Sequence, residues 1–240
     1  MAEQRDTNAE IWKSEEIVKE WARTQSDRDA QRVEHWRLLA KLLPFGVEES
    51  FTFADLGAGA GAASSYILDR YPRATAMLTD YSPQMITAGT EALARFAGRF
   101  RYIEFDMLEG TWPDELGDGI DAVVTSLCVH HLPDERKQWL FGEIRAHLRP
   151  VGWYLNYDPI TASSEATAKA WERVGDLDDP TAPERRAHRS ETEQARYENH
   201  VRYMIPLAPQ LGWLEDAGFD GVDVYWKYLD NVIYGGVRPA

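Results

Sequence analysis

Residues 51–61 read Phe-Thr-Phe-Ala-Asp-Leu-Gly-Ala-Gly-Ala-Gly, and this stretch decides the fold. The segment from Phe51 to Leu56 is short and apolar, which is typical of a buried strand. The glycines that follow allow a sharp backbone turn, and they leave no Cβ in the way of a ligand. An alanine-rich segment from Ala62 to Tyr71 then predicts a helix. A strand, a glycine turn and a helix in this order indicate a ligand-binding α/β sheet.

Strand-like and helix-like segments alternate along the rest of the chain. The pattern predicts two helices within Ile11–Leu43, and further helices at Pro83–Phe96, Pro133–Leu148 and Ala208–Ala217. It predicts further strands at Ala74–Thr79, Phe100–Phe105, Ile120–Leu127, Gly152–Tyr157, Val222–Tyr228 and Val232–Tyr234. Such alternation implies a mostly parallel sheet with helices on both faces. Ligands of these sheets bind outside the carboxyl ends of the strands.

One polar segment interrupts the alternation and suggests how the chain is organised. Residues 161–203 are polar and charged and show helical spacing in places. We therefore expect four parts: an N-terminal helical cap (1–50), an α/β core (51–160), a helical insertion or lid (161–205) and the completion of the core (206–240). The two caps are expected to cover the mouth of the site, because catalysis benefits from the exclusion of water.

Composition limits the function classes. The chain has 240 residues and a formal net charge of -14, which disfavours broad binding to nucleic acid. It has no apolar run long enough to span a membrane and no pattern of a signal peptide, so we expect no membrane association. Cys128 is its one cysteine, which suits a reducing cytoplasm, the expected location. The expected partner is a small molecule, and a homodimer is compatible with the sequence.

The glycine turn differs from the turns that bind nucleotide phosphates. It reads G-x-G-x-G rather than G-x-G-x-x-G, and no Lys or Arg lies between Asp55 and Ser65. A carboxylate at the turn suits a ligand that carries positive charge. The alternative is a turn that only connects strand to helix.

Two further acidic residues follow the next two strands. Asp80 is placed to accept hydrogen bonds from a ribose diol, or to cap the helix that begins near Pro83. Asp106 could accept from an adenine amine while Met107 packs on the ring, or it could belong to an ordinary acidic turn. The three acidic positions together are more specific than any one of them.

With these motifs the chain resembles the class I S-adenosylmethionine-dependent methyltransferases, from about Phe51 to Asp158 and again from Trp213 to Gly236. The resemblance implies a Rossmann-like, seven-stranded, mostly parallel sheet with one antiparallel strand, and S-adenosyl-L-methionine as cofactor. It implies a glycine motif at Asp55, Gly57, Gly59 and Gly61, a ribose-binding Asp80 and an adenine-side Asp106. The remaining expected cofactor-binding residues are Tyr81, Met85, Met107, Ser126 and Leu127.

His130 and His131 follow the strand that precedes Leu127 and are the candidate catalytic residues. They could serve as a general base, could orient the substrate, or could be structural histidines of a turn. Asp158, at the end of the next strand, could contact substrate or belong to a turn. Two adjacent histidines are a poor metal motif, so no metal site is expected.

Aromatic and polar residues of the two caps are the other candidates for substrate binding. In the insertion these are Tyr197, His200 and Tyr203, and near the N-terminus they are Trp12 and Trp21. The basic residues of the insertion, such as Arg185 and Arg196, could anchor an acidic group or form a solvated, charge-paired face.

The resemblance implies methyl transfer to a small-molecule acceptor by in-line displacement, achieved mainly through positioning. Two alternatives use the same fold: an enzyme that uses a modified S-adenosylmethionine or acts on RNA, and a cofactor-binding regulator without catalysis. A nicotinamide-dependent dehydrogenase is a weaker alternative.

Overall fold

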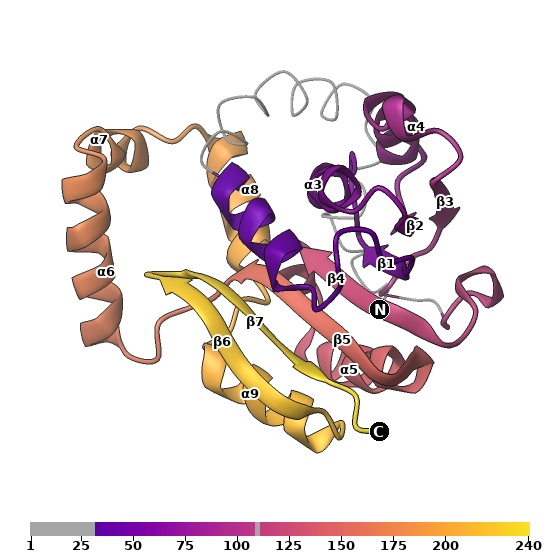
Figure 1. The fold of residues 1–240 in the computed structure, drawn as a ribbon. Coiled ribbons are helices and arrows are strands. Elements are labelled where there is room, and N and C mark those ends of the chain that lie inside the picture. The colour runs from indigo at the N-terminus through magenta and orange to yellow at the C-terminus, as the bar shows by residue number, and fades with distance from the viewer. Residues whose placement is uncertain (1–31, 109–110) are drawn as a thin grey trace, which may run out of the picture.

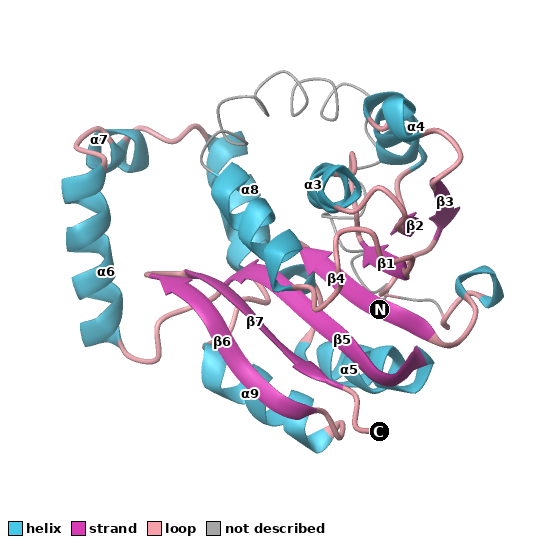
Figure 2. Ribbon diagram, viewed as in Figure 1, coloured by secondary structure: helices cyan, strands magenta, loops and turns pink. Residues whose placement is uncertain are grey.

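The computed structural model describes residues 32–108 and 111–240, which form a seven-stranded sheet with helices on both faces (Figures 1 and 2). The strand order is β3-β2-β1-β4-β5-β7-β6. Among the described strands only β7 runs antiparallel to its neighbours. The predicted Rossmann-like sheet is therefore confirmed. The strands are β1 (Thr52–Leu56), β2 (Thr75–Asp80), β3 (Phe100–Glu104), β4 (Ile120–Ser126), β5 (Leu148–Pro159), β6 (Asp220–Tyr228) and β7 (Asn231–Val237).

The helices follow the predicted segments closely. Residues 32–42 are helical, and the later helices are α3 (Ala62–Arg70), α4 (Pro83–Ala92), α5 (Asp134–His147), α6 (Glu165–Asp178), α7 (Ala182–Ala187), α8 (Glu191–Val201) and α9 (Leu207–Asp216). Short 3₁₀ turns are η1 (Ala94–Phe96), η2 (Asp114–Leu116) and η3 (Val129–His131). The helix predicted from Pro83 to Phe96 is split, because the Phe96 N–H bonds Leu93 O and tightens the last turn to 3₁₀ geometry.

Two apolar layers enclose the sheet, because successive strand residues point to opposite faces. Phe53 and Val124 pack on one face with helix 32–42 and α3. Ala54 and Val123 pack on the other with α5 and α9. Figure 2 shows these helices on the two sides of the sheet. Burial of both faces explains why the central strands are almost wholly apolar.

The inserted segment folds as three helices, α6 to α8, between β5 and α9. Helix α6 lies beyond the tips of β6 and β7 (Figure 1), and the Tyr228 hydroxyl donates to Asp178 on α6 over 2.7 Å. Helix α8 contacts η3. Its start is fixed by a capping box, in which Ser190 and Glu193 each accept from the other's backbone N–H.

Some predictions concern residues that the structure does not describe. Trp12, Trp21 and the first predicted helix lie outside the described residues.

The expectation of no membrane span can be compared with part of the chain. Within residues 32–108 and 111–240, no helix is both long enough and apolar enough to cross a membrane.

Lys137 ties the insertion to the core. This side chain on α5 is almost fully buried, and its ammonium donates to Asp134 and to the backbone carbonyl of Tyr203. Lys137→Met should leave that carbonyl unpaired, at a cost of about 1–3 kcal/mol in the free energy of unfolding. Hydrogen exchange should accelerate in residues 191–203.

Lys169→Met is the matched control, since Lys169 is an exposed lysine that pairs with Glu165 on α6. It should change neither stability nor exchange measurably. Equal exchange in the two variants would contradict the anchoring role of Lys137.

Candidate functional site

The carboxyl ends of five strands bring the predicted residues to one edge of the sheet. Parallel pairing aligns Leu56 of β1 with Thr79 of β2 and with Thr125 of β4. It also aligns Ser126 at the end of β4 with Tyr157 of β5. The glycine turn, Asp80, Asp106, the histidine pair and Asp158 therefore follow neighbouring strand ends, as the sequence predicted from the alternation.

Each glycine of the turn has positive φ, with values of 68° at Gly57, 54° at Gly59 and 77° at Gly61. A Cβ on Gly57 would lie 2.1 Å from the Cys128 sulfur, so the turn after β1 packs directly on the turn after β4. A Cβ on Gly59 would meet nothing within 4 Å. Gly59 therefore borders open space, where a ligand can approach the backbone.

Asp55 is a buried carboxylate that the fold satisfies only in part. It is 1% exposed, and its Oδ2 accepts a 2.6 Å hydrogen bond from Ser64. Within residues 32–108 and 111–240, its Oδ1 has no hydrogen-bond partner. Burial raises the pKa of Asp55 to about 7. An unpartnered buried oxygen beside a glycine turn fits a cationic group, and the ammonium of S-adenosylmethionine is one.

Asp80 links β2 to the glycine turn. Its Oδ2 accepts from the Gly59 N–H over 2.8 Å, and its Oδ1 accepts from the Ser82 N–H over 2.9 Å. Burial raises its pKa, while these backbone donors oppose the rise. The N-cap of α4 is Ser82, which accepts from the Met85 N–H. The alternative that Asp80 caps this helix is therefore wrong.

The adenine-side candidates lie after β3. Asp106 Oδ1 accepts from the Leu108 N–H over 2.9 Å, as in an acidic turn. The other carboxylate oxygen of Asp106 does not take part in this bond. Met107 is buried, with its terminal carbon next to Gly57. Tyr81 is half-buried and Met85 is buried at the start of α4. These positions fit one wall of an adenosine site.

Sequence reasoning missed Tyr102, which braces this wall. Its hydroxyl donates to the carbonyl of Gly59 over 2.9 Å. A Cβ on Gly89 of α4 would lie 1.9 Å from the same hydroxyl oxygen. The signal was Gly89 itself, because a glycine inside a helix often marks a close approach by another group.

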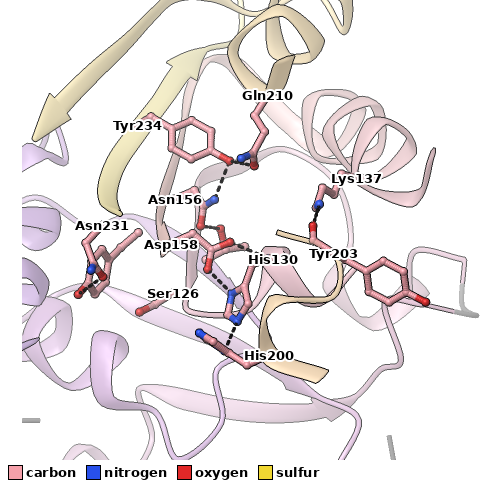
Figure 3. A network of polar contacts seen from close by, with 12 residues as sticks. Ser126, His130, Lys137, Asn156, Asp158, His200, Tyr203, Gln210, Asn231 and Tyr234 are labelled. Carbon is pink, nitrogen blue, oxygen red and sulfur yellow. Dashed lines mark hydrogen bonds and ion pairs between the residues drawn. The ribbon is translucent and has the colours of Figure 1, made fainter. Parts of the chain in front are cut away.

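A polar cluster occupies the edge where β4 and β5 end (Figure 3). Asp158, 1% exposed, accepts from the backbone N–H of His130 and bonds His130 Nδ1, each over 2.7 Å. The other ring nitrogen of His130 lies 3.1 Å from His200 Nδ1 on α8. Burial lowers the pKa of His130 well below its ordinary value and raises that of Asp158. A neutral His130 with Nδ1–H donating to Asp158 presents a lone pair on Nε2.

His131 lies beside this cluster, with its ring centroid 3.8 Å from that of His130. Its Nδ1 is buried and has no hydrogen-bond partner among the described residues. Leu127, just before the turn, has a φ of 57°, an uncommon value for a leucine. Strained residues of this kind gather at functional sites, where the surrounding structure holds them in place.

Helix 32–42 reaches the same edge through two of its side chains. The indole N–H of Trp36 donates to the Ser126 hydroxyl over 2.9 Å. His35 Nδ1 lies 3.1 Å from the Tyr157 hydroxyl. Residues 32–42 therefore contact β4 and β5 near their carboxyl ends as well as packing on the core.

A chain of buried, hydrogen-bonded polar side chains lies beside Asp158 (Figure 3). Sequence reasoning also missed this chain. The Asn156 amide donates to the Tyr234 hydroxyl, which donates in turn to Gln210 (Figure 3). The Thr125 hydroxyl donates to Asn156 over 2.8 Å. An asparagine inside the apolar segment Tyr154–Tyr157 was the available signal, because buried polar groups need partners.

The structure does not bring every predicted residue to the cluster. Tyr197 is 43% exposed, with the Arg189 guanidinium 3.9 Å from its ring centroid. The Tyr203 ring points away from the histidines in Figure 3. Arg185 pairs with Asp179, as on a solvated, charge-paired face. The substrate-binding roles of Tyr197 and Tyr203 stay predictions.

Known proteins share this fold. The family model of the methyltransferase domain matches residues 54–154. Comparison with curated protein sequences gives no significant match. Many solved structures are similar. Human N-acetylserotonin methyltransferase in complex with S-adenosylmethionine has 15% identity and a TM-score of 0.66, over 100% of this chain and 61% of that chain.

Two other solved structures show the range of relatives. An O-methyltransferase family protein from Burkholderia thailandensis has 19% identity and a TM-score of 0.61, over 95% of this chain and 64% of that one. The CurJ carbon methyltransferase has 16% identity and a TM-score of 0.60, over 85% of this chain and 54% of that one. At these identities the likeness shows the fold. The chain spans about three fifths of the length of these proteins.

Gly59 provides a test of ligand approach that is separate from folding. Gly59→Ala should destabilise the protein by about 1–2 kcal/mol, because alanine disfavours positive φ. Its methyl group should also obstruct the open space and weaken the binding of S-adenosylhomocysteine, measured by calorimetric titration.

Gly98→Ala is the matched control. Gly98 has a φ of 83°, and a Cβ there would also meet nothing within 4 Å, but it precedes β3 at the opposite edge of the sheet. It should lose similar stability in a thermal melt and keep full affinity. Normal affinity in the Gly59 variant would mean that the turn is only a connector.

Proposed function

We propose that the chain transfers a methyl group from S-adenosylmethionine to a small-molecule acceptor, because a methyltransferase-domain model matches residues 54–154 and the fold is that of S-adenosylmethionine-dependent methyltransferases. The observation that carries the proposal is Asp55. It holds a buried, unpartnered carboxylate oxygen beside a glycine turn that faces open space. A turn that only connected a strand to a helix would not require this oxygen, because a buried polar atom without a partner costs free energy.

In this proposal, three carboxylates each bind a different part of the cofactor. Asp55 faces the ammonium group, Asp80 accepts from the ribose hydroxyls, and Asp106 accepts from the adenine amine. Met107 and Met85 supply apolar surface for the adenosine, and Ser126 and Leu127 line the methionine side. S-adenosylmethionine supplies a methyl group already activated by its positive sulfur.

The acceptor binds, in this proposal, between the η3 turn and α8. Asp158 bonds the ring of His130 at Nδ1, so the ring cannot turn freely, and it also accepts from the backbone N–H of His130. It orients the acceptor and takes its proton where the acceptor carries one. Positioning provides most of the acceleration, since orientation alone can supply roughly 7–11 kcal/mol in model systems. A net charge of -14 favours a small molecule over nucleic acid as acceptor.

The direct test is turnover. Purified protein is incubated with S-adenosylmethionine and panels of hydroxyl, amine, thiol and carbon acceptors, and S-adenosylhomocysteine is measured by mass spectrometry. Acceptor-dependent product is expected. Tight cofactor binding with no turnover on any panel would favour the regulatory alternative, and binding of a nicotinamide cofactor instead would overturn the proposal.

Asp80→Ala should weaken cofactor binding by about 1.5–3 kcal/mol for each charge-assisted hydrogen bond lost. Asp69→Ala is the control, because Asp69 is an exposed acid on α3 whose carboxylate pairs with Arg95 at the surface. It should bind normally. Unchanged affinity in a folded Asp80 variant, measured by calorimetry, would remove Asp80 from the ribose site.

Asp55 should make cofactor binding depend on pH. The pKa of its carboxyl is about 7 in the free protein, so roughly half of the molecules carry this proton at pH 7. A cationic ammonium next to Oδ1 favours the ionised form and expels the proton. Affinity should therefore rise as pH increases from about 6 to 7.5.

The measurement is calorimetric titration in buffers of different ionisation enthalpy, which counts protons released on binding. Release of about half a proton at pH 7 is expected for the natural protein. Asp55→Asn should bind more weakly and lose this release. The same proton release in the Asn variant would assign it to another group.

A further inference from the structure

We propose that His130, His131 and His200 form a binding site for a divalent transition-metal ion that prefers imidazole ligands, with Zn²⁺ as the reference ion. Each histidine offers one ring nitrogen, and the three nitrogens lie within 4.8 Å of one another. Among the residues that the structure describes, this is the one group of histidine, cysteine or acidic side chains with such spacing.

The spacing is close to that of a loaded site. Zinc binds imidazole nitrogen at about 2.0–2.1 Å, so two ligands of a tetrahedral site lie about 3.3 Å apart. His130 Nε2 and His200 Nδ1 are 3.1 Å apart. No separation in the cluster exceeds this ideal by more than about 1.5 Å.

Asp158 prepares His130 as a ligand. Its carboxylate accepts from His130 Nδ1, which fixes the tautomer and turns the Nε2 lone pair toward His200. A carboxylate behind a histidine is the usual outer-shell partner of a metal site, and it raises the basicity of the ligand.

His131 supplies the independent observation. Its Nδ1 is buried and has no partner in the part of the chain that the structure describes, although the ring lies against His130 and its centroid lies 5.8 Å from that of His200. A buried ring nitrogen without a partner is costly unless something binds there. His200 is exposed, so the cluster has one side toward solvent.

The ion would join two parts of the chain that are far apart in sequence. His130 and His131 lie on η3, at the end of β4, whereas His200 lies on α8 in the insertion. Binding would therefore tie the insertion to the catalytic edge and leave a fourth position for water or an acceptor oxygen. It would also occupy the lone pair of His130, so the loaded site could not use that nitrogen to take a proton.

The test uses the full chain without an affinity tag, freed of metal by a chelator and with no S-adenosylmethionine present. Titration with Zn²⁺ should show one ion bound per chain and a rise in Tm, because a ligand of the folded state stabilises it. Co²⁺ should give the visible absorption of a tetrahedral site, and Mg²⁺ should not bind, since it prefers oxygen ligands.

Two variants decide which residues bind. His200→Ala changes an exposed residue of α8, and the core of the variant should still fold, as a thermal melt without metal can check. It should lose at least the roughly 10–100-fold in affinity that removal of an outer-shell partner costs. His188→Ala is the control, because His188 ends α7 in the same insertion and its Nδ1 bonds the carbonyl of Glu184. It should bind Zn²⁺ as the natural protein does.

Absence of stoichiometric Zn²⁺ binding would overturn the proposal and leave the cluster as a hydrogen-bonded histidine pair beside Asp158. Equal affinity of the His200 variant and the natural protein would overturn it as well. Neither result depends on methyl transfer, so the metal site and the proposed function can fail separately.

Discussion

The contact between Gly57 and Cys128 is the constraint on which the site depends. The turn after β1 passes so close to the turn after β4 that a Cβ on Gly57 would lie 2.1 Å from the cysteine sulfur. This packing fixes the distance between the half of the site that carries Asp55 and the half that carries His130. A larger residue at either position would separate the two strand ends, and the proposed reaction would tolerate little misplacement.

The same strand ends also carry buried carboxylates. Asp55, Asp80 and Asp158 are all nearly inaccessible to solvent, and burial raises the pKa of each. Asp80 and Asp158 are compensated by backbone N–H donors and by His130. Asp55 is compensated only through Ser64. Because Asp55 is only partly paired, its negative charge is not fully compensated by the protein, and a cationic ligand bound beside it would compensate the rest.

The sequence predicted the sheet and its strand-end residues because both depend on local patterns. Apolar runs, glycines and prolines mark the elements, and parallel strands bring their carboxyl ends together regardless of detail. The contacts of Tyr102 and Trp36 could not be predicted in this way. Tyr102 reaches Gly59 across 43 positions and Trp36 reaches Ser126 across 90, and only packing decides these contacts. His200 was among the predicted substrate-binding residues, but its hydrogen bond with His130 could not be predicted, because it lies 70 positions further along the chain and only the path of the insertion brings it near. The expectation of no metal site did not take this contact into account.

The insertion has little core of its own, and this makes its attachment to the carboxyl ends of β4 and β5 informative. No residue of α6 or α7 is buried. The insertion is held by the Tyr228 contact at one end and, at the other, by Lys137 and the histidine cluster. A segment with few buried contacts opens at a low free-energy cost. The interactions of His200 and of the Tyr203 carbonyl therefore weigh heavily in whether α8 stays over the site, and a group that binds between α8 and η3 adds its own affinity to the closed arrangement.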